Sequence, residues 1–306
     1  MIAGSHVLPL VCSDREIPRQ VHCVAKWHGP SYSIAITHSR EGRRLPQNNG
    51  FETLALLATD TDKAQDAHAE LSELFDFVPI EQADAVVVLG GDGYMLHALH
   101  QMLDQGALKP AYGINMGTVG FMMNRPRKRP DLLATVNRAS KRVVAPLRME
   151  AIDQNGAEFS ASAINEVSLL RETRQTAKIE VMVGGKVRIA ELVCDGVLVS
   201  TPVGSTAYNL SANGPILPLD SQVLALTPIS PFRPRRWRGA ILPEYYEIKL
   251  RVLEPKKRPV AVVADQHEFR DIAEVSVAID RSAELVLLFD PGHSLDERIV
   301  AEQFVT

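Results

Sequence analysis

Two loops of the chain combine small residues with groups that could bind or move a phosphate. The longer loop, residues 195–211, reads DGVLVSTPVGSTAYNLS, so an apolar run leads into hydroxyl groups, a glycine and the ring of Tyr208. Such a loop can wrap a sugar or phosphate with amides and hydroxyls while the ring covers a flat base. The shorter loop, residues 90–93, also follows an apolar run and carries the carboxylate of Asp92. Together the loops predict a nucleotide site with one acidic group at its reacting end.

The chemistry of the shorter loop depends on Asp92 and on the glycines beside it. Glycines let the backbone approach a phosphate closely and point amides at it. A helix that begins near Tyr94 would add its positive N-terminus. Asp92 could then accept a proton from an attacking hydroxyl, hold magnesium, or do both. The alternative is a tight turn in which Asp92 only caps the helix.

Three further segments could belong to the same site. Residues 115–121, NMGTVGF, form another glycine-bearing loop after a strand, or an ordinary turn. Asn165 and Glu166 interrupt an apolar, strand-like run and suit an adenine edge and ribose hydroxyls, unless they form a solvated bulge. The basic run 233–238, RPRRWR, could hold phosphates, although a solvated loop or a subunit contact is the simpler interpretation. His97 and His100 are expected to be packing or surface residues rather than ligands.

The first half of the chain alternates strand and helix patterns. Strands are expected at 33–37, 83–89 and 110–114, and helices at 51–75 and 94–103. This alternation predicts an α/β fold with an open, mostly parallel, Rossmann-like sheet. Ligands of such sheets lie beyond the carboxyl ends of the strands, where both glycine-rich loops lie.

The second half changes to an antiparallel all-β pattern. Two hairpins are expected, one around Asn155-Gly156 with a type I′ turn and one around Gly184-Gly185. Four more strand-like runs cover 245–253, 260–264, 274–279 and 284–289. The chain is therefore divided into an N-terminal extension (1–30), an α/β domain (31–145), a sandwich-like, β-rich domain (146–289) and a tail that packs back on the first domain (290–306).

Composition excludes several classes of protein. The 306 residues carry a formal net charge of −4, so bulk electrostatics favour neither nucleic acid nor an anionic membrane. Apolar runs all fall short of the roughly 20 residues that span a bilayer, and the N-terminus lacks the basic start of a secretory signal. Three widely spaced cysteines predict neither a disulfide framework nor a zinc site. A cytoplasmic protein is the simplest expectation.

In this order, the motifs resemble those of NAD kinases. The resemblance rests on GGDG at 90–93, NMG at 115–117, Asn165-Glu166, DG at 195–196 leading to STAY at 205–208, LTPISP at 226–231 and the ending DERIVAEQF at 296–304. It covers most of the chain from about residue 33 to residue 304. It implies transfer of the terminal phosphoryl of ATP, or of polyphosphate in some members, to the 2′-hydroxyl of the adenosine ribose of NAD, which gives NADP.

The resemblance also implies roles for single residues. Asp92 would accept the 2′-hydroxyl proton or orient that hydroxyl, and Ser230 would lie near a base. The NAD-binding residues would be Asp92, Gly93, Asn165, Glu166, Asp195, Thr206, Ala207, Tyr208, Asn209, Leu210, Ser211 and Ser230, and the phosphate loop would be Gly90, Gly91, Asn115 and Gly117. The resemblance further implies a divalent cation, magnesium, with unidentified protein ligands. It implies a homodimer or homotetramer, in which a neighbouring subunit can complete the NAD site.

The chain departs from the family pattern at three places. Tyr94 stands where many members have a threonine, Val193 where many have an arginine, and residues 265–267 read DQH where the family has Asp-Gly-Gln. Two alternatives stay open at this point. A lipid kinase of the diacylglycerol or sphingosine type shares the GGDG loop, and a non-catalytic NAD sensor would share the binding residues.

Overall fold

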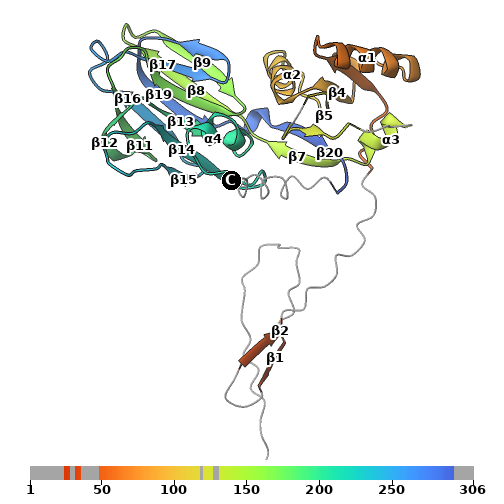
Figure 1. Cartoon of the computed structure of the whole chain (residues 1–306), viewed down its shortest axis with the longest axis horizontal. Coiled ribbons are helices and arrows are strands. Elements are labelled where there is room, and N and C mark those ends of the chain that lie inside the picture. Colours follow the sequence, from red (N-terminus) through yellow and green to blue (C-terminus); the bar gives the residue numbers. More distant parts are fainter. Residues whose placement is uncertain (1–23, 28–31, 36–47, 118–119, 127–130, 293–306) are drawn as a thin grey trace, which may run out of the picture. The chain divides into compact units, whose positions relative to one another are not determined.

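The computed structural model describes residues 24–27, 32–35, 48–117, 120–126 and 131–292 (Figure 1). It divides into two units, residues 1–45 and 46–306. In the first unit, β1 (Val24–Trp27) pairs with β2 (Tyr32–Ala35) in an antiparallel two-stranded sheet. The strand expected at 33–37 therefore exists, but its partner is β1. All other elements belong to the second unit.

An open α/β sheet forms the N-terminal part of the second unit (Figure 1). Its strands lie in the order β3-β4-β5-β20-β7, with β6 beside β5, and every pair except β20–β7 is parallel. This confirms the predicted mostly parallel sheet. The strands are β3 (Leu54–Ala58), β4 (Ala85–Gly90), β5 (Ala111–Asn115), β6 (Met123–Asn124), β7 (Ser140–Val144) and β20 (Leu285–Phe289).

Helices cover both faces of this sheet. The apolar side of α2 (Asp92–Asp104) packs with Val86 and Val88 of β4, whereas α1 (Asp62–Leu74) and α3 (Leu132–Asn137) pack with Ala85 and Val87. Because successive side chains of a strand point to opposite faces, the two helix layers lie on opposite sides. This explains why every residue of β4 is buried and apolar. A short 3-10 helix, Ile80–Gln82, precedes β4.

The predicted helix over 51–75 was wrong in its first half. Residues 54–58 form β3, and the helix begins only at Asp62, after an N-cap at Thr61. Apolar residues at 54, 57, 64, 67, 71 and 74 fit one helical period, but the polar run 59–62, TDTD, separates two elements. The first strand of the α/β sheet is therefore β3.

The β-rich part is a sandwich of two antiparallel six-stranded sheets, as predicted. Their inner faces share one core, in which Ile179 and Leu250 of one sheet are buried with Leu169 and Val197 of the other. One sheet contains, in order, β12 (Lys186–Cys194), β11 (Ala177–Val183), β16 (Ile248–Val252), β19 (Ile272–Ile279), β8 (Leu147–Asp153) and β9 (Glu158–Ala163). The other contains β15 (Ala240–Pro243), β14 (Val223–Ile229), β13 (Gly196–Ser200), β10 (Glu166–Arg171), β17 (Val260–Ala264) and β18 (His267–Phe269).

Both predicted hairpins are present, with different turns. Gly184 and Gly185 have φ of 58° and 73°, the positive pair that a type I′ turn requires. At the other hairpin only Gly156 has a positive φ, so the expected type I′ turn is wrong. The Asp153 carboxylate accepts the backbone N–H groups of Asn155 and Ala157 instead, and this bonding holds a longer loop.

The strand at 285–289 does not belong to the sandwich, although it was assigned to the β-rich domain. As β20, it returns to the α/β sheet and lies between β5 and β7. The chain crosses between the two parts after β7 and again before β20, where Asp280 donates its backbone N–H to the carbonyl of Pro146 at 2.8 Å. Most of the expected tail, residues 293–306, lies outside the described residues.

Candidate active site

Asp92 lies where the parallel sheet ends and α2 begins. Its carboxylate accepts the backbone N–H of Phe121 at 2.6 Å and that of Met122 at 2.9 Å. Gly120 lies so close that a Cβ there would be 2.9 Å from Asp92 Oδ1. Asp92 is the first residue of the helix, and the N-cap is Gly91. The alternative that Asp92 merely caps the helix is therefore wrong, because its carboxylate binds the loop that follows β5.

The predicted phosphate loop lies at the carboxyl ends of β4 and β5. Gly90 ends β4, and a Cβ there would lie 2.9 Å from Cβ of Tyr94, so the first turn of α2 packs tightly on it. Asn115 ends β5 and accepts the backbone N–H of Gly117 at 2.9 Å, which turns the chain. Backbone amides at a helix start beside such a turn can bind an anion.

Asn165 and Glu166 do not sit inside one strand. They lie at the junction between β9 of one sheet and β10 of the other, where Glu166 is the first residue of β10, so this part of the prediction was wrong. Asp265 holds the junction: its carboxylate accepts the backbone N–H groups of Ile164 at 2.6 Å, Asn165 at 3.0 Å and Glu166 at 3.1 Å. Asp265 was not among the predicted site residues, although the departure from the family pattern at 265–267 marked its segment.

Glu166 lies beside Tyr208. Burial and the Asp265 carboxylate raise the pKa of Glu166 to about 7, and a hydrogen bond from the backbone N–H of Tyr208 offsets part of this shift. Burial also raises the pKa of the Tyr208 phenol, with additional effects of the Glu166 and Asp195 carboxylates. Oε2 of Glu166 is buried and has no hydrogen-bond partner among the described residues. The Glu166 and Asp195 carboxylates therefore both lie close enough to the Tyr208 phenol to raise its pKa.

Several polar side chains of the hydroxyl-rich loop make hydrogen bonds within the protein. Thr201 donates to the carbonyl of Ile164 at 2.7 Å, and Ser205 Oγ donates to Pro202 and accepts from the N–H of Leu217. Buried Asn209 donates to two carbonyls and accepts the hydroxyl of Thr227 at 2.7 Å. This bonding shapes the 3-10 turn Val203–Thr206 and α4 (Tyr208–Ser211). Thr206, Ala207, Tyr208 and Leu210 are half-buried and Ser211 is exposed.

Asp195 directly follows β12, and Ser230 directly follows β14. Asp195 Oδ1 is 2.6 Å from Nε of Arg171 on the neighbouring strand, and both side chains are about one-third exposed. Ser230 is exposed, has a φ of 47° and lines a cavity of about 410 Å³ with Trp237 and Arg238 of the basic run. The other lining residues include Asn213, which follows α4 closely.

Two contacts bring the α/β part and the sandwich together at the site. Phe121 and Met122, which bind Asp92, line a small apolar cavity with Val203 and Thr206 of the hydroxyl loop. On the same helix as Asp92, buried His100 binds Asp265, which holds the 165–166 junction. The turn that binds Asp92 therefore lines a cavity with the loop that carries Tyr208, although the two segments are far apart in the sequence.

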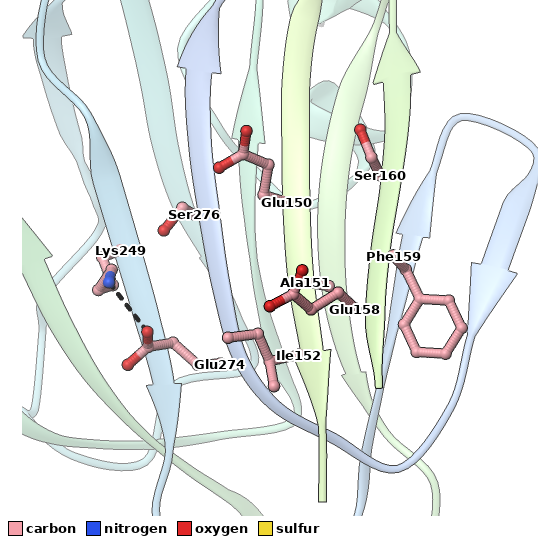
Figure 2. A pocket seen from close by; sticks show the side chains of 9 residues that line it. All are labelled: Glu150, Ala151, Ile152, Glu158, Phe159, Ser160, Lys249, Glu274 and Ser276. Carbon is pink, nitrogen blue, oxygen red and sulfur yellow. Dashed lines mark hydrogen bonds and ion pairs between the residues drawn. The ribbon is translucent and has the colours of Figure 1, made fainter. Parts of the chain in front are cut away.

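A third, wider cavity of about 600 Å³ lies on the outer face of the sandwich (Figure 2). Glu150, Glu158 and the ion pair of Lys249 with Glu274 point into it. It contains none of the predicted site residues. Among the described residues no three His, Cys, Asp or Glu side chains gather as metal ligands, and no helix there is long and apolar enough to cross a membrane.

Comparison with known proteins decides the family. Residues 39–141 match the model of the ATP-NAD kinase N-terminal domain, and residues 164–288 match that of the ATP-NAD kinase C-terminal domain. The chain belongs to the NAD kinase family. The predicted resemblance is thereby confirmed.

Relatives in this family are similar over nearly their full length. The NAD kinase of Rhizorhabdus wittichii is 59% identical over 254 residues, which are 83% of this chain and 98% of the relative. The NAD kinase of Zymomonas mobilis is 56% identical over 83% of this chain and 98% of the relative. The NAD kinase of Caulobacter vibrioides is 53% identical over 82% of this chain and 95% of the relative.

Solved NAD kinase structures share the fold. Yeast NADH kinase complexed with NADH superposes with a TM-score of 0.70 at 19% identity, over 83% of this chain and 88% of its own. An NAD kinase from Archaeoglobus fulgidus in complex with ATP gives a TM-score of 0.65 at 22% identity, over 82% of this chain and 98% of its own. At these identities the likeness concerns the fold alone.

Proposed function

We propose that the chain transfers the terminal phosphoryl group of ATP to the 2′-hydroxyl of the adenosine ribose of NAD, giving NADP and ADP. Membership of the NAD kinase family supports this activity. The observation that carries the proposal for this chain is the fixed carboxylate of Asp92, held by Phe121 and Met122, which line a small cavity with the hydroxyl-rich loop. The comparisons give no support to a lipid kinase or to a non-catalytic sensor.

Asp92 is the proton acceptor in this proposal. The 2′-oxygen attacks the terminal phosphorus, the bond to the ADP oxygen breaks, and the hydroxyl proton passes to the Asp92 carboxylate. A carboxylate is a weak base towards a ribose hydroxyl, so the proton moves late, as the new P–O bond forms. Two backbone N–H groups hold the carboxylate in place before substrate arrives, which lowers the cost of reorganisation.

The sandwich supplies most of the proposed NAD-binding residues, and α2 adds Gly93. Glu166 suits a ribose hydroxyl because a buried carboxylate oxygen without a partner favours a donor. Tyr208 offers a ring for stacking beside it. We assign NAD contacts to Gly93, Asn165, Glu166, Asp195, Thr206, Ala207, Tyr208, Leu210, Ser211 and Ser230. Asn209, which was also expected to bind NAD, instead supports the loop, because its amide already makes three hydrogen bonds within the protein.

The residues of this site fit magnesium that binds together with the nucleotide. The described residues offer no cluster of three acidic or imidazole ligands, and both Asp92 oxygens accept backbone amides. Mg²⁺ commonly keeps several waters and uses one or two carboxylates plus substrate phosphates. We therefore propose that ATP phosphates hold the cation, which would neutralise the charge of the triphosphate.

Assembly and location are further parts of the proposal. We expect a homodimer or homotetramer. Exposed Ile241 in the edge strand β15 and exposed Tyr245 just after it support a subunit contact there. Sedimentation analysis of the purified chain would test this assembly. A cytoplasmic location remains a prediction from composition.

An end-point assay tests the proposed activity. Purified chain is incubated with NAD, ATP and magnesium, and NADP is measured with an NADP-specific dehydrogenase. We expect NADP to form in amounts that follow enzyme concentration. Absence of NADP, or transfer of radiolabelled phosphate to lipid instead, would overturn the proposal.

A further inference from the structure

Asp265 lies in the two-residue turn between β17 and β18, and its side chain is fully buried. Oδ2 accepts hydrogen bonds from His100 Nε2 at 2.7 Å and from the N–H of Ile164 at 2.6 Å. Oδ1 accepts the N–H groups of Asn165 at 3.0 Å and Glu166 at 3.1 Å. Since each carboxylate oxygen has two lone pairs, these four bonds use its whole accepting capacity inside the protein.

His100 is the partner that comes from the α/β part. It lies on α2, eight residues after Asp92, and its side chain is only 4% exposed. A helix rises about 1.5 Å per residue, so the two residues are roughly 12 Å apart along one rigid element. A carboxylate can only accept, so Nε2 of His100 carries the hydrogen of this bond.

The hydrogen bond between His100 and Asp265 supplements apolar packing between α2 and Ile164. Ile164 belongs to the same buried cluster as Met95 and Leu99 of α2, so the helix already packs against the start of the 165–166 junction. Apolar packing is not directional and permits small shifts. A buried hydrogen bond to a charged acceptor fixes distance and angle.

We propose that His100 and Asp265 are positioning residues for phosphoryl transfer, because they hold the 165–166 junction at a fixed place relative to Asp92. This inference rests on the proposed function, in which that junction binds NAD and Asp92 accepts the 2′-hydroxyl proton. The pair aligns the hydroxyl with the base through the length of α2. A misplacement of about 1 Å can lower turnover by roughly 100-fold.

Three substitutions in the full chain separate positioning from general support. His100→Ala removes the donor, whereas His100→Gln places an amide Nε2 the same number of bonds from the backbone and keeps it. His97→Ala is the matched control, because His97 is exposed on the same helix. The readouts are kcat, KM for NAD and the thermal midpoint.

His100→Ala should lower kcat by roughly 10- to 100-fold and change KM for NAD by less than about threefold, since all the assigned NAD contacts except Gly93 lie on the sandwich side. His100→Gln should restore most of the turnover, and His97→Ala should match the unmodified chain. If His100→Ala does not fold, His100→Asn serves in its place, because its amide is one bond too short to reach Asp265.

Two results would overturn the positioning role. One is a kcat of His100→Ala within about twofold of the unmodified chain. The other is a loss that His100→Gln does not restore, which would point to general support of the helix. Absence of NADP formation by the unmodified chain would overturn the proposed function and this role together, whereas normal turnover in His100→Ala overturns this role alone.

Discussion

Phe121 donates its backbone N–H to the Asp92 carboxylate at 2.6 Å, and this bond joins the helix after β4 to the loop after β5. The neighbouring N–H of Met122 binds the other oxygen at 2.9 Å. The orientation of the base is therefore built into the backbone of the 120–122 turn. Substitutions in that turn should act on Asp92 without touching NAD.

Gly120→Ala should reduce turnover through this turn. The added Cβ would lie 2.9 Å from Asp92 Oδ1 and 3.0 Å from Cγ of Met123, so the carboxylate must shift. We expect kcat to fall by roughly 10- to 100-fold, as for a small misplacement of a reacting group. Steady-state kinetics give kcat, and calorimetry should show nearly unchanged NAD affinity. A variant with normal kcat would mean that the contact is relieved without moving Asp92.

Tyr208→Ala should weaken NAD binding by about 1–3 kcal/mol if the ring stacks on a base. Tyr208→Phe is the control, because it keeps the ring and removes only the hydroxyl. Calorimetric titration with NAD measures both affinities. Unchanged affinity in Tyr208→Ala would show that the ring serves packing rather than NAD.

Thr227→Val should destabilise the hydroxyl-rich loop by removing a buried hydrogen bond to Asn209. The Thr227 hydroxyl donates to Asn209 Oδ1 at 2.7 Å, and both side chains are buried. Valine has the same shape and leaves that oxygen unsatisfied, so the free energy of unfolding should fall by about 1–3 kcal/mol. Urea unfolding measures it. An unchanged unfolding free energy would mean that water or another donor replaces the hydroxyl.

Glu166 should make stability depend on pH. Its pKa rises from 4.5 in a free side chain to about 7 in the folded protein, mainly through burial. The folded state therefore binds this proton more tightly, so the contribution of Glu166 to stability is greatest below about pH 4.5 and is lost as pH rises to about 7. The total loss is roughly 3 kcal/mol, because each pKa unit corresponds to about 1.4 kcal/mol.

Glu166→Gln isolates this effect. Its unfolding free energy relative to the unmodified chain should increase between about pH 5 and about pH 8 in urea titrations. Glu158→Gln is the control, because Glu158 is exposed. An equal difference at both pH values would contradict the assignment of the titration to Glu166.

The sequence predicted most of the fold because its strongest signals are local. The run 85–89 is apolar on both faces, which indicates a buried parallel strand, and Gly184-Gly185 supplies the backbone angles of a tight hairpin. The strand 285–289 was misassigned because nothing local reveals its partners. β5 and β7 lie about 140 residues or more away along the chain.

The sequence predicted the residues that could react or bind better than the buried contacts that hold them in place. Asp92, Glu166 and Tyr208 were expected from residue type and family resemblance. Glu166 lies beside Tyr208, and the turn that binds Asp92 lines a cavity with the loop that carries Tyr208. Asp265 and His100 were missed as a pair, since a buried hydrogen bond across 165 residues leaves no periodic signal. Asn209 carries the same amide whether it meets a ligand or a buried threonine, and only the fold shows its hydrogen bond with Thr227.

Turnover of Asp92→Asn tests the central claim most directly. Asparagine keeps the size of the side chain but cannot take up the 2′-hydroxyl proton. With NAD, ATP and magnesium at saturation, NADP formation should fall by at least roughly 100-fold while NAD affinity measured by calorimetry stays close to that of the unmodified chain. Turnover within about threefold of the unmodified chain would contradict the role of Asp92 as the proton acceptor.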